Sequence, residues 1–151
     1  MPRWLSLLYG ISAVVGSIVG LVFMVPVLLQ GGHFGFPGEL LLLLSFSLYA
    51  FGIWSGMKAI RGRDGWSRSA RWFWLAQVPM FSSSTFSFFI SCAAGIWVYG
   101  RYGSQGLGAG ASAYLGSGLR WSYGQGTPEI VIGINILALL AALFLFKRSP
   151  Q

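Results

Sequence analysis

Three side chains could bind a cation if the fold brought them together: His33, Glu39 and Glu129. Two carboxylates and an imidazole suit a divalent ion. Each glutamate also begins an apolar segment, where a helix dipole favours a negative charge, and Pro128 suits a first helical turn. Two interpretations are therefore open, a metal site at an outer rim or two helix starts beside a loop histidine. The second is favoured, so no metal or cofactor is predicted.

The residues needed for catalysis are sparse. Serine is abundant, but no His, Asp or Glu lies deep in an apolar segment to act as a base. Cys92 is the single cysteine, which excludes an intramolecular disulfide and a redox centre built from cysteine pairs. Proton-coupled transporters usually place an ionisable group inside the membrane, and none is found here. The sequence predicts a protein that is not an enzyme.

A series of hydroxyl groups could nevertheless line a polar path. Four consecutive hydroxyl residues, 82–85, are followed by two further serines. In a helix over 72–99 four of these serines would share a face. They could donate hydrogen bonds to neighbouring helices or line a cavity, together with polar groups at a similar depth in other segments. The candidate polar layer comprises Ser45, Ser47, Ser83, Ser84, Ser87, Ser91 and Asn135.

The composition indicates which elements would position these groups. Hydrophobic residues make up 55% of the 151 residues and charged residues only 9%, whereas soluble domains carry about 25% charge. A bilayer core is crossed by about 20 apolar residues. We therefore expect an all-α membrane protein, one domain with four transmembrane helices in an up-and-down bundle. The spans cover about 4–29, 40–57, 72–99 and 130–146, with a glycine-rich outer loop over 100–127 that cannot bury a core.

The basic residues predict the orientation of these spans. Of the ten Lys and Arg residues, only Arg101 and Arg120 would lie outside if the N-terminus is inside. The positive-inside rule then places both termini in the cytoplasm of a bacterial inner membrane. The first span is too long for a signal peptide, whose apolar region covers about 7–15 residues. The inner set is Arg3, Lys58, Arg61, Arg63, Arg68, Arg71, Lys147 and Arg148.

Small residues recur every four positions in three of the spans. This spacing lets helix backbones approach closely, either within one chain or between copies. The residues are Ser12, Gly16 and Gly20, then Gly52 and Gly56, and Gly95 at the end of the serine series.

These patterns favour an accessory or assembly subunit that acts through helix contacts. The alternative is a small transporter or pore subunit, a homo-oligomer built around the hydroxyl face of the third span. Binding of anionic lipid headgroups by the inner basic loop is a third interpretation. The expected partners are the lipid bilayer and another membrane protein or a second copy. Nucleic acid is not expected, because the aromatic residues lie mostly within apolar spans.

Overall fold

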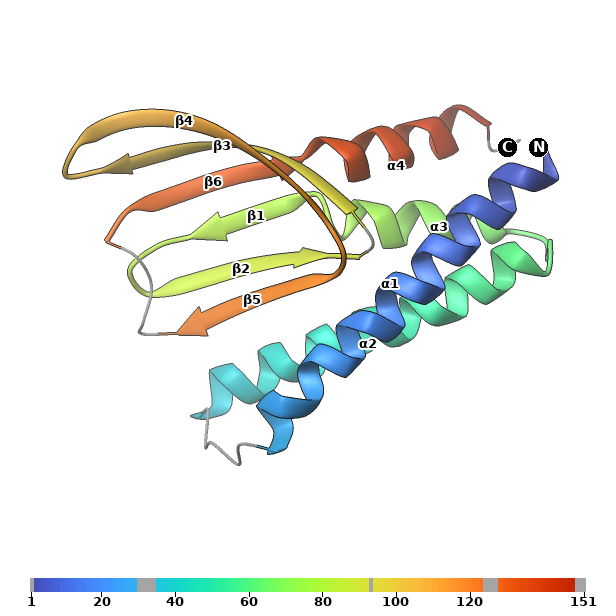
Figure 1. Ribbon diagram of the computed structural model, residues 1–151, viewed down its shortest axis with the longest axis horizontal. Coiled ribbons are helices and arrows are strands. Elements are labelled where there is room, and N and C mark those ends of the chain that lie inside the picture. Colours follow the sequence, from blue (N-terminus) through green and yellow to red (C-terminus); the bar gives the residue numbers. More distant parts are fainter. Residues whose placement is uncertain (1, 30–34, 93, 124–127, 149–151) are drawn as a thin grey trace.

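The computed structural model describes residues 2–29, 35–92, 94–123 and 128–148 and has a mixed α/β architecture (Figure 1). The prediction of an all-α bundle of four transmembrane helices is therefore wrong. In chain order the elements are α1 (Arg3–Leu29), α2 (Gly35–Ile60), α3 (Trp66–Leu75), β1 (Pro79–Ser82), β2 (Phe86–Ser91), β3 (Ala94–Gly103), β4 (Gly106–Leu115), β5 (Gly118–Tyr123), β6 (Ile130–Asn135) and α4 (Ile136–Arg148).

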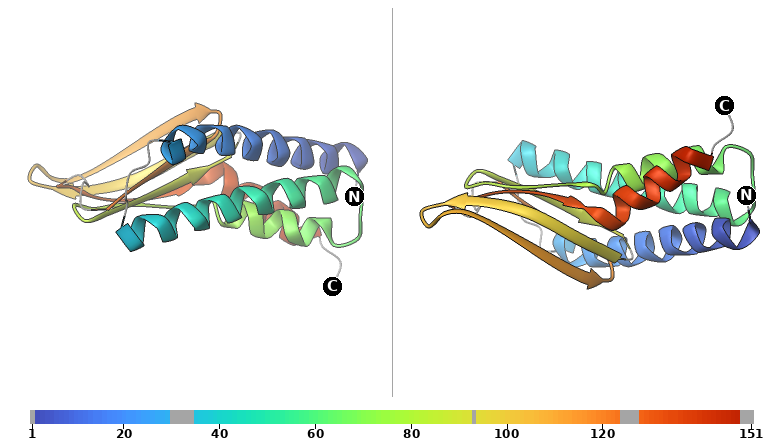
Figure 2. Two further views of the ribbon diagram at one scale, coloured as in Figure 1. Left: turned by 90° about the horizontal axis from the view of Figure 1, so that it is seen from below. Right: turned by 90° about the horizontal axis from the view of Figure 1, so that it is seen from above.

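The first two helices form a long antiparallel hairpin. α1 and α2 lie side by side along one side of the molecule in all three views (Figures 1 and 2). Within the described residues they are the two helices whose length and apolarity would allow them to cross a membrane. The predicted third and fourth spans do not exist as such helices.

In the part of the chain that the structure describes, six strands form a single antiparallel sheet in the order β4-β3-β6-β1-β2-β5. Its two edge strands, β4 and β5, are consecutive in the chain and are joined through Gly116 and Ser117. Figure 1 shows β4 curling across the sheet to reach this connection. Gly116 has a φ of 118°, which glycine adopts without the steric cost that other residues face. The sheet is therefore strongly curved, with a concave and a convex face.

The hydroxyl cluster forms a turn where a third transmembrane helix was expected. Ser83 donates its backbone N–H to the carbonyl of Phe86 at 2.7 Å, and its side-chain oxygen accepts the Phe86 N–H at 3.1 Å. Pro79 and the Ser/Thr run disfavour a continuous helix. The aromatic and branched residues that follow suit paired strands instead.

The glycine-rich segment 100–127 was predicted to be an outer loop, and over its described residues it consists of strands. Its glycines make room for large side chains of neighbouring strands. A Cβ on Gly110 would lie 2.7 Å from the Tyr99 hydroxyl oxygen, and one on Gly108 would lie 2.8 Å from Nε of Arg101. Glycine here permits close packing within a sheet.

The predicted fourth span divides at Asn135. Residues 130–135 form β6, and α4 follows directly. The Asn135 side-chain oxygen accepts the backbone N–H of Ala138 at 3.2 Å, so Asn135 caps the first turn of α4. The alternation of Ile and Val before this cap is typical of a strand.

The buried core lies where the hairpin meets α3, α4 and the end of β2. Phe73, Ile90 and Leu145 are almost completely buried there, together with Tyr49 from α2. α3 and α4 pack against each other at one end of the hairpin, and the sheet lies beside the other part of it (Figure 1).

Candidate functional site

The pairing register separates the sheet into two chemically different faces. Side chains alternate between faces along each strand, and directly paired residues share a face. The pairs Ser82–Ser87, Trp97–Ser112 and Tyr99–Gly133 therefore lie on one face, which is concave. On the convex face lie Pro79, Phe81, Ile96, Val98, Gly100, Tyr102, Leu107, Ala109, Ala111, Ala113, Leu115, Ile130, Ile132 and Ile134.

The concave face contains a pocket of about 320 Å³, which we call the sheet pocket. The hydroxyl oxygens of Ser82 and Ser87 are 2.7 Å apart within it. The rings of Phe89 and Tyr114 are 5.7 Å apart at its wall. An apolar pocket with a few hydroxyl groups suits a small, partly apolar molecule. Its lining is Met80, Phe81, Ser82, Ser87, Phe88, Phe89, Tyr99, Ser112 and Tyr114, of which the paired Phe81 and Phe88 belong by register to the other face.

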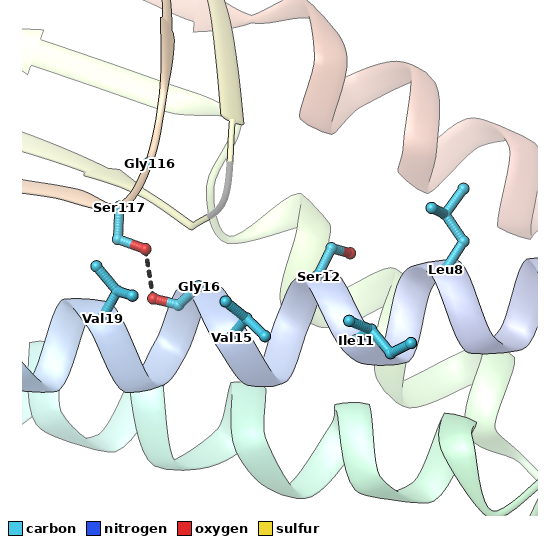
Figure 3. Close-up of a pocket in the computed structure, with 8 residues that line it drawn as sticks. All are labelled: Leu8, Ile11, Ser12, Val15, Gly16, Val19, Gly116 and Ser117. Atoms are coloured by element: carbon cyan, nitrogen blue, oxygen red, sulfur yellow. Dashed lines mark hydrogen bonds between the residues drawn. The ribbon is translucent and has the colours of Figure 1, made fainter.

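A second cavity, the α1 groove, runs between α1 and the β4–β5 connection and has a volume of about 330 Å³ (Figure 3). The Ser117 hydroxyl donates to the carbonyl oxygen of Gly16. The Ser12 hydroxyl donates to the carbonyl oxygen of Tyr9 at 3.1 Å. Because both hydroxyl groups bond to backbone carbonyls and the other lining residues are apolar or glycine, the groove is mainly apolar. Its lining is Leu8, Ile11, Ser12, Val15, Gly16, Val19, Gly116 and Ser117.

The small residues predicted to mediate helix packing lie in three places. Ser12 and Gly16 line the α1 groove. Gly20 lies against the ring of Tyr49, and Gly52 lies against the Ser17 side chain. The remaining two are Gly56, whose added Cβ would lie 2.7 Å from the carbonyl oxygen of Gly10, and Gly95, whose added Cβ would lie 2.5 Å from Nε1 of Trp97.

The candidate polar layer is likewise distributed over several sites. Asn135 and Ser91 are fully buried. The side-chain oxygen of Asn135 accepts a hydrogen bond from the backbone nitrogen of Ile96 at 3.4 Å. Ser45 is buried in α2 and donates to the carbonyl of Leu41 at 2.8 Å.

The other members of that layer lie on α2 or in the first two strands and the turn that joins them. Ser47 is exposed on α2, and Ser83 and Ser84 belong to the β1–β2 turn. Ser87 alone of the set lines the sheet pocket. The structure thus brings together neither a helical hydroxyl face nor a single polar layer.

The candidate rim site is only partly described. His33 lies outside the described residues. Glu39 is exposed near the start of α2, and Glu129 lies close to Gly103 beside β6. Over the described ranges, no three His, Cys, Asp or Glu side chains gather in a way that could hold a metal ion.

Gln77 was not identified as a site residue from the sequence, yet it is completely buried. Its Nε2 donates to the carbonyl of Phe73 at 3.2 Å, and its Oε1 accepts the Cys92 N–H at 2.8 Å. It therefore links the end of α3 to the end of β2. In the sequence, the one sign of such a role is that Gln77 is a polar residue in an apolar segment, two positions before Pro79.

The basic residues gather where α1 begins and where α2 and α4 end (Figure 1). We call this region the basic end. Arg71 lies over the ring of Phe146, 4.0 Å from its centre, and Lys58 lies 5.2 Å from the centre of the Trp54 ring. Asp64 is the acidic residue in the α2–α3 connection. The residues of the basic end are Arg3, Lys58, Arg61, Arg63, Arg68, Arg71 and Lys147.

Comparison with known proteins provides no family for this chain. No protein-family model, curated protein or solved structure matches it.

Proposed function

We propose that the protein is a membrane-anchored accessory subunit of a bacterial inner membrane, held by the α1–α2 hairpin. The observation that carries this proposal is the outer surface of that hairpin. Val22 and Phe23 on α1 and Leu43 on α2 are about 60% exposed, and many of their neighbours are large and apolar. Such a surface is costly in water and suits lipid hydrocarbon.

The charge distribution supports one orientation for the anchor. Arg3 and Lys58 lie at the same end of the hairpin, together with the basic α2–α3 connection. The positive-inside rule favours this end for the cytoplasm. The exposed indole rings of Trp4 and Trp72 suit an interface between lipid and water.

The role proposed for the anchored protein is contact with another membrane protein, without catalysis. The sheet pocket offers hydroxyl groups but has no carboxylate or imidazole in its lining. The α1 groove is an apolar surface along the face of α1 that is not covered by α2. Apolar grooves of this kind receive helices of partner proteins.

Two cysteine variants test the orientation in a Cys92→Ala background. Asp64→Cys lies in the α2–α3 connection, and Ser104→Cys lies in the turn between β3 and β4. In intact spheroplasts a membrane-impermeant maleimide should label Ser104→Cys only. After lysis it should label both. Labelling of both sites before lysis, or release of the protein by alkaline carbonate, would contradict the anchor.

A second candidate function is a small transporter or pore subunit that works as a homo-oligomer. The hydroxyl-bearing concave face of the sheet favours it, because polar groups on one face can line an aqueous path. Native mass spectrometry after gentle solubilisation separates the candidates. A stoichiometric foreign partner supports the accessory subunit, and a closed homo-oligomer without one supports the transporter.

A further inference from the structure

We infer that the curved sheet lies at the depth of the bilayer as an incomplete barrel wall, with its convex face against lipid hydrocarbon and its concave face hydrated. This inference rests on the proposed anchoring by α1 and α2. It assigns a lipid-contact surface to strands, in addition to the hairpin.

The depth of the sheet follows from one contact. Ser117, in the connection between β4 and β5, donates a hydrogen bond to the carbonyl of Gly16 (Figure 3). Gly16 lies near the middle of α1, which runs from Arg3 to Leu29. If α1 crosses the bilayer, the β4–β5 connection therefore lies near its mid-plane.

The convex face has the composition that this depth requires. Its central side chains are between 41% and 62% exposed and carry no charge or hydrogen-bonding group, whereas the Tyr102 hydroxyl lies near the end of β3. Alternation of apolar residues outside and polar residues inside is the pattern of strands in membrane barrels. These central residues are Ile96, Val98, Ile132 and Ile134.

The apolar surface continues from β6 onto α4. Leu140, Leu143 and Phe146 are each about half exposed there. The stretch begins after Glu129 and ends at Lys147, at the basic end. The six residues of β6 and the eleven apolar residues of α4, placed end to end, would span roughly 36 Å. This length is close to the ~30 Å hydrocarbon core of a bilayer. The apolar band thus has the length of a membrane and a basic boundary that matches anionic headgroups.

The concave face explains how an open sheet could be tolerated at this depth. β4 is an edge strand with one side of its backbone unpaired by the sheet. Such an edge is very unfavourable in hydrocarbon but is tolerated where it lines a water-filled cavity. β4 borders the sheet pocket, to which it contributes the hydroxyl group of Ser112.

Spin labels on three positions test this arrangement in proteoliposomes of phosphatidylethanolamine and phosphatidylglycerol. The labels are attached to Ile132→Cys on the convex face, Ser112→Cys on the concave face and Val22→Cys on α1, each in a Cys92→Ala background. Collisions with oxygen report lipid, and collisions with a water-soluble nickel chelate report water. Val98→Cys replaces Ile132→Cys if that variant does not give the circular dichroism spectrum of the parent protein.

The expected result is a ratio of oxygen to nickel collisions at Ile132→Cys that equals the ratio at Val22→Cys and is several-fold above that at Ser112→Cys. Nickel access at Ile132→Cys with Val22→Cys still in lipid would overturn the inference and leave the anchor intact. Nickel access at Val22→Cys would overturn the anchor itself. Dipolar broadening at Ile132→Cys that disappears on dilution with unlabelled protein would show a second copy on this face and also overturn the inference.

Discussion

The helical hairpin and the curved sheet are both rich in glycine, but Gly56 in the hairpin and Gly110 in the sheet make room for different neighbours. In the hairpin a Cβ on Gly56 would lie 2.7 Å from the carbonyl oxygen of Gly10, so the obstacle is backbone. In the sheet a Cβ on Gly110 would lie 2.7 Å from the end of the Tyr99 side chain. A ring can rotate away, whereas a helix backbone moves only with the whole helix. The two positions should therefore differ in their tolerance of larger residues.

The largest effect is expected for Gly56→Leu. The new side chain would force α1 and α2 apart along their contact, which should lower the free energy of unfolding by at least about 3 kcal/mol. Thermal unfolding in detergent micelles, followed by circular dichroism, measures the loss. Ala50→Leu is the matched control, because Ala50 is exposed on the same helix and should tolerate the change. Equal losses in both variants would refute close packing of the hairpin.

The next effect concerns the junction between the sheet and α4. Asn135→Ala removes the oxygen that accepts the N–H groups of Ala138 and Ile96. The loss of a helix cap should reduce the free energy of unfolding by about 2 kcal/mol. Asn135→Ser retains a capping hydroxyl and should recover part of the loss in the same thermal measurement. Identical stability of the Ala and Ser variants would argue against the cap.

A smaller effect is expected for Gly110→Val in the sheet. The Tyr99 ring has to move, and the cost should be about 1 kcal/mol. Ala111→Val, one position along on the exposed convex face, should be neutral. Tyr99→Ala combined with Gly110→Val should restore much of the loss in a double-mutant cycle. No coupling between the two positions would mean that the ring does not lie over Gly110.

The smallest effect is expected for Ser87→Ala in the sheet pocket. It removes one hydrogen bond, between the Ser87 and Ser82 hydroxyl groups, and should lower stability by less than about 1 kcal/mol. Ser84→Ala is the control, because Ser84 is exposed in the β1–β2 turn. Chemical denaturation compares the two. A loss of several kcal/mol would make Ser87 a structural residue and remove it from the candidate pocket.

The sequence allowed the hairpin to be predicted closely and the sheet not at all. Predicted spans 4–29 and 40–57 fall within α1 and α2, because a long uncharged run leaves few alternatives to a helix. The next apolar segments were assigned by hydropathy alone, which measures how apolar a segment is and not its period. Ile130–Asn135 is rich in β-branched residues, which favour a strand and which hydropathy does not distinguish from helix formers.

The candidate site was predictable only in part. The gathering of basic residues at one end followed from their positions at the ends of apolar segments. The sheet pocket did not, because it depends on pairing between strands that are far apart in the chain, such as β3 with β6. Glycines within 100–127 were interpreted as a sign of an unstructured loop. Their role became visible only once Tyr99 and Arg101 were placed on the neighbouring strand.

The contact between the β4–β5 connection and the middle of α1 joins the two regions, and a cross-link tests it most directly. In the Cys92→Ala background, Val19→Cys and Ser117→Cys lie on facing sides of the α1 groove (Figure 3). Oxidation in membranes, or a short bis-maleimide, should give an intramolecular cross-link. Leu8→Cys with Ser117→Cys should not, because Leu8 lies more than two helical turns from Gly16, whose carbonyl accepts the Ser117 hydroxyl. Equal cross-linking of both pairs, or of neither, would contradict a sheet seated at the middle of the hairpin.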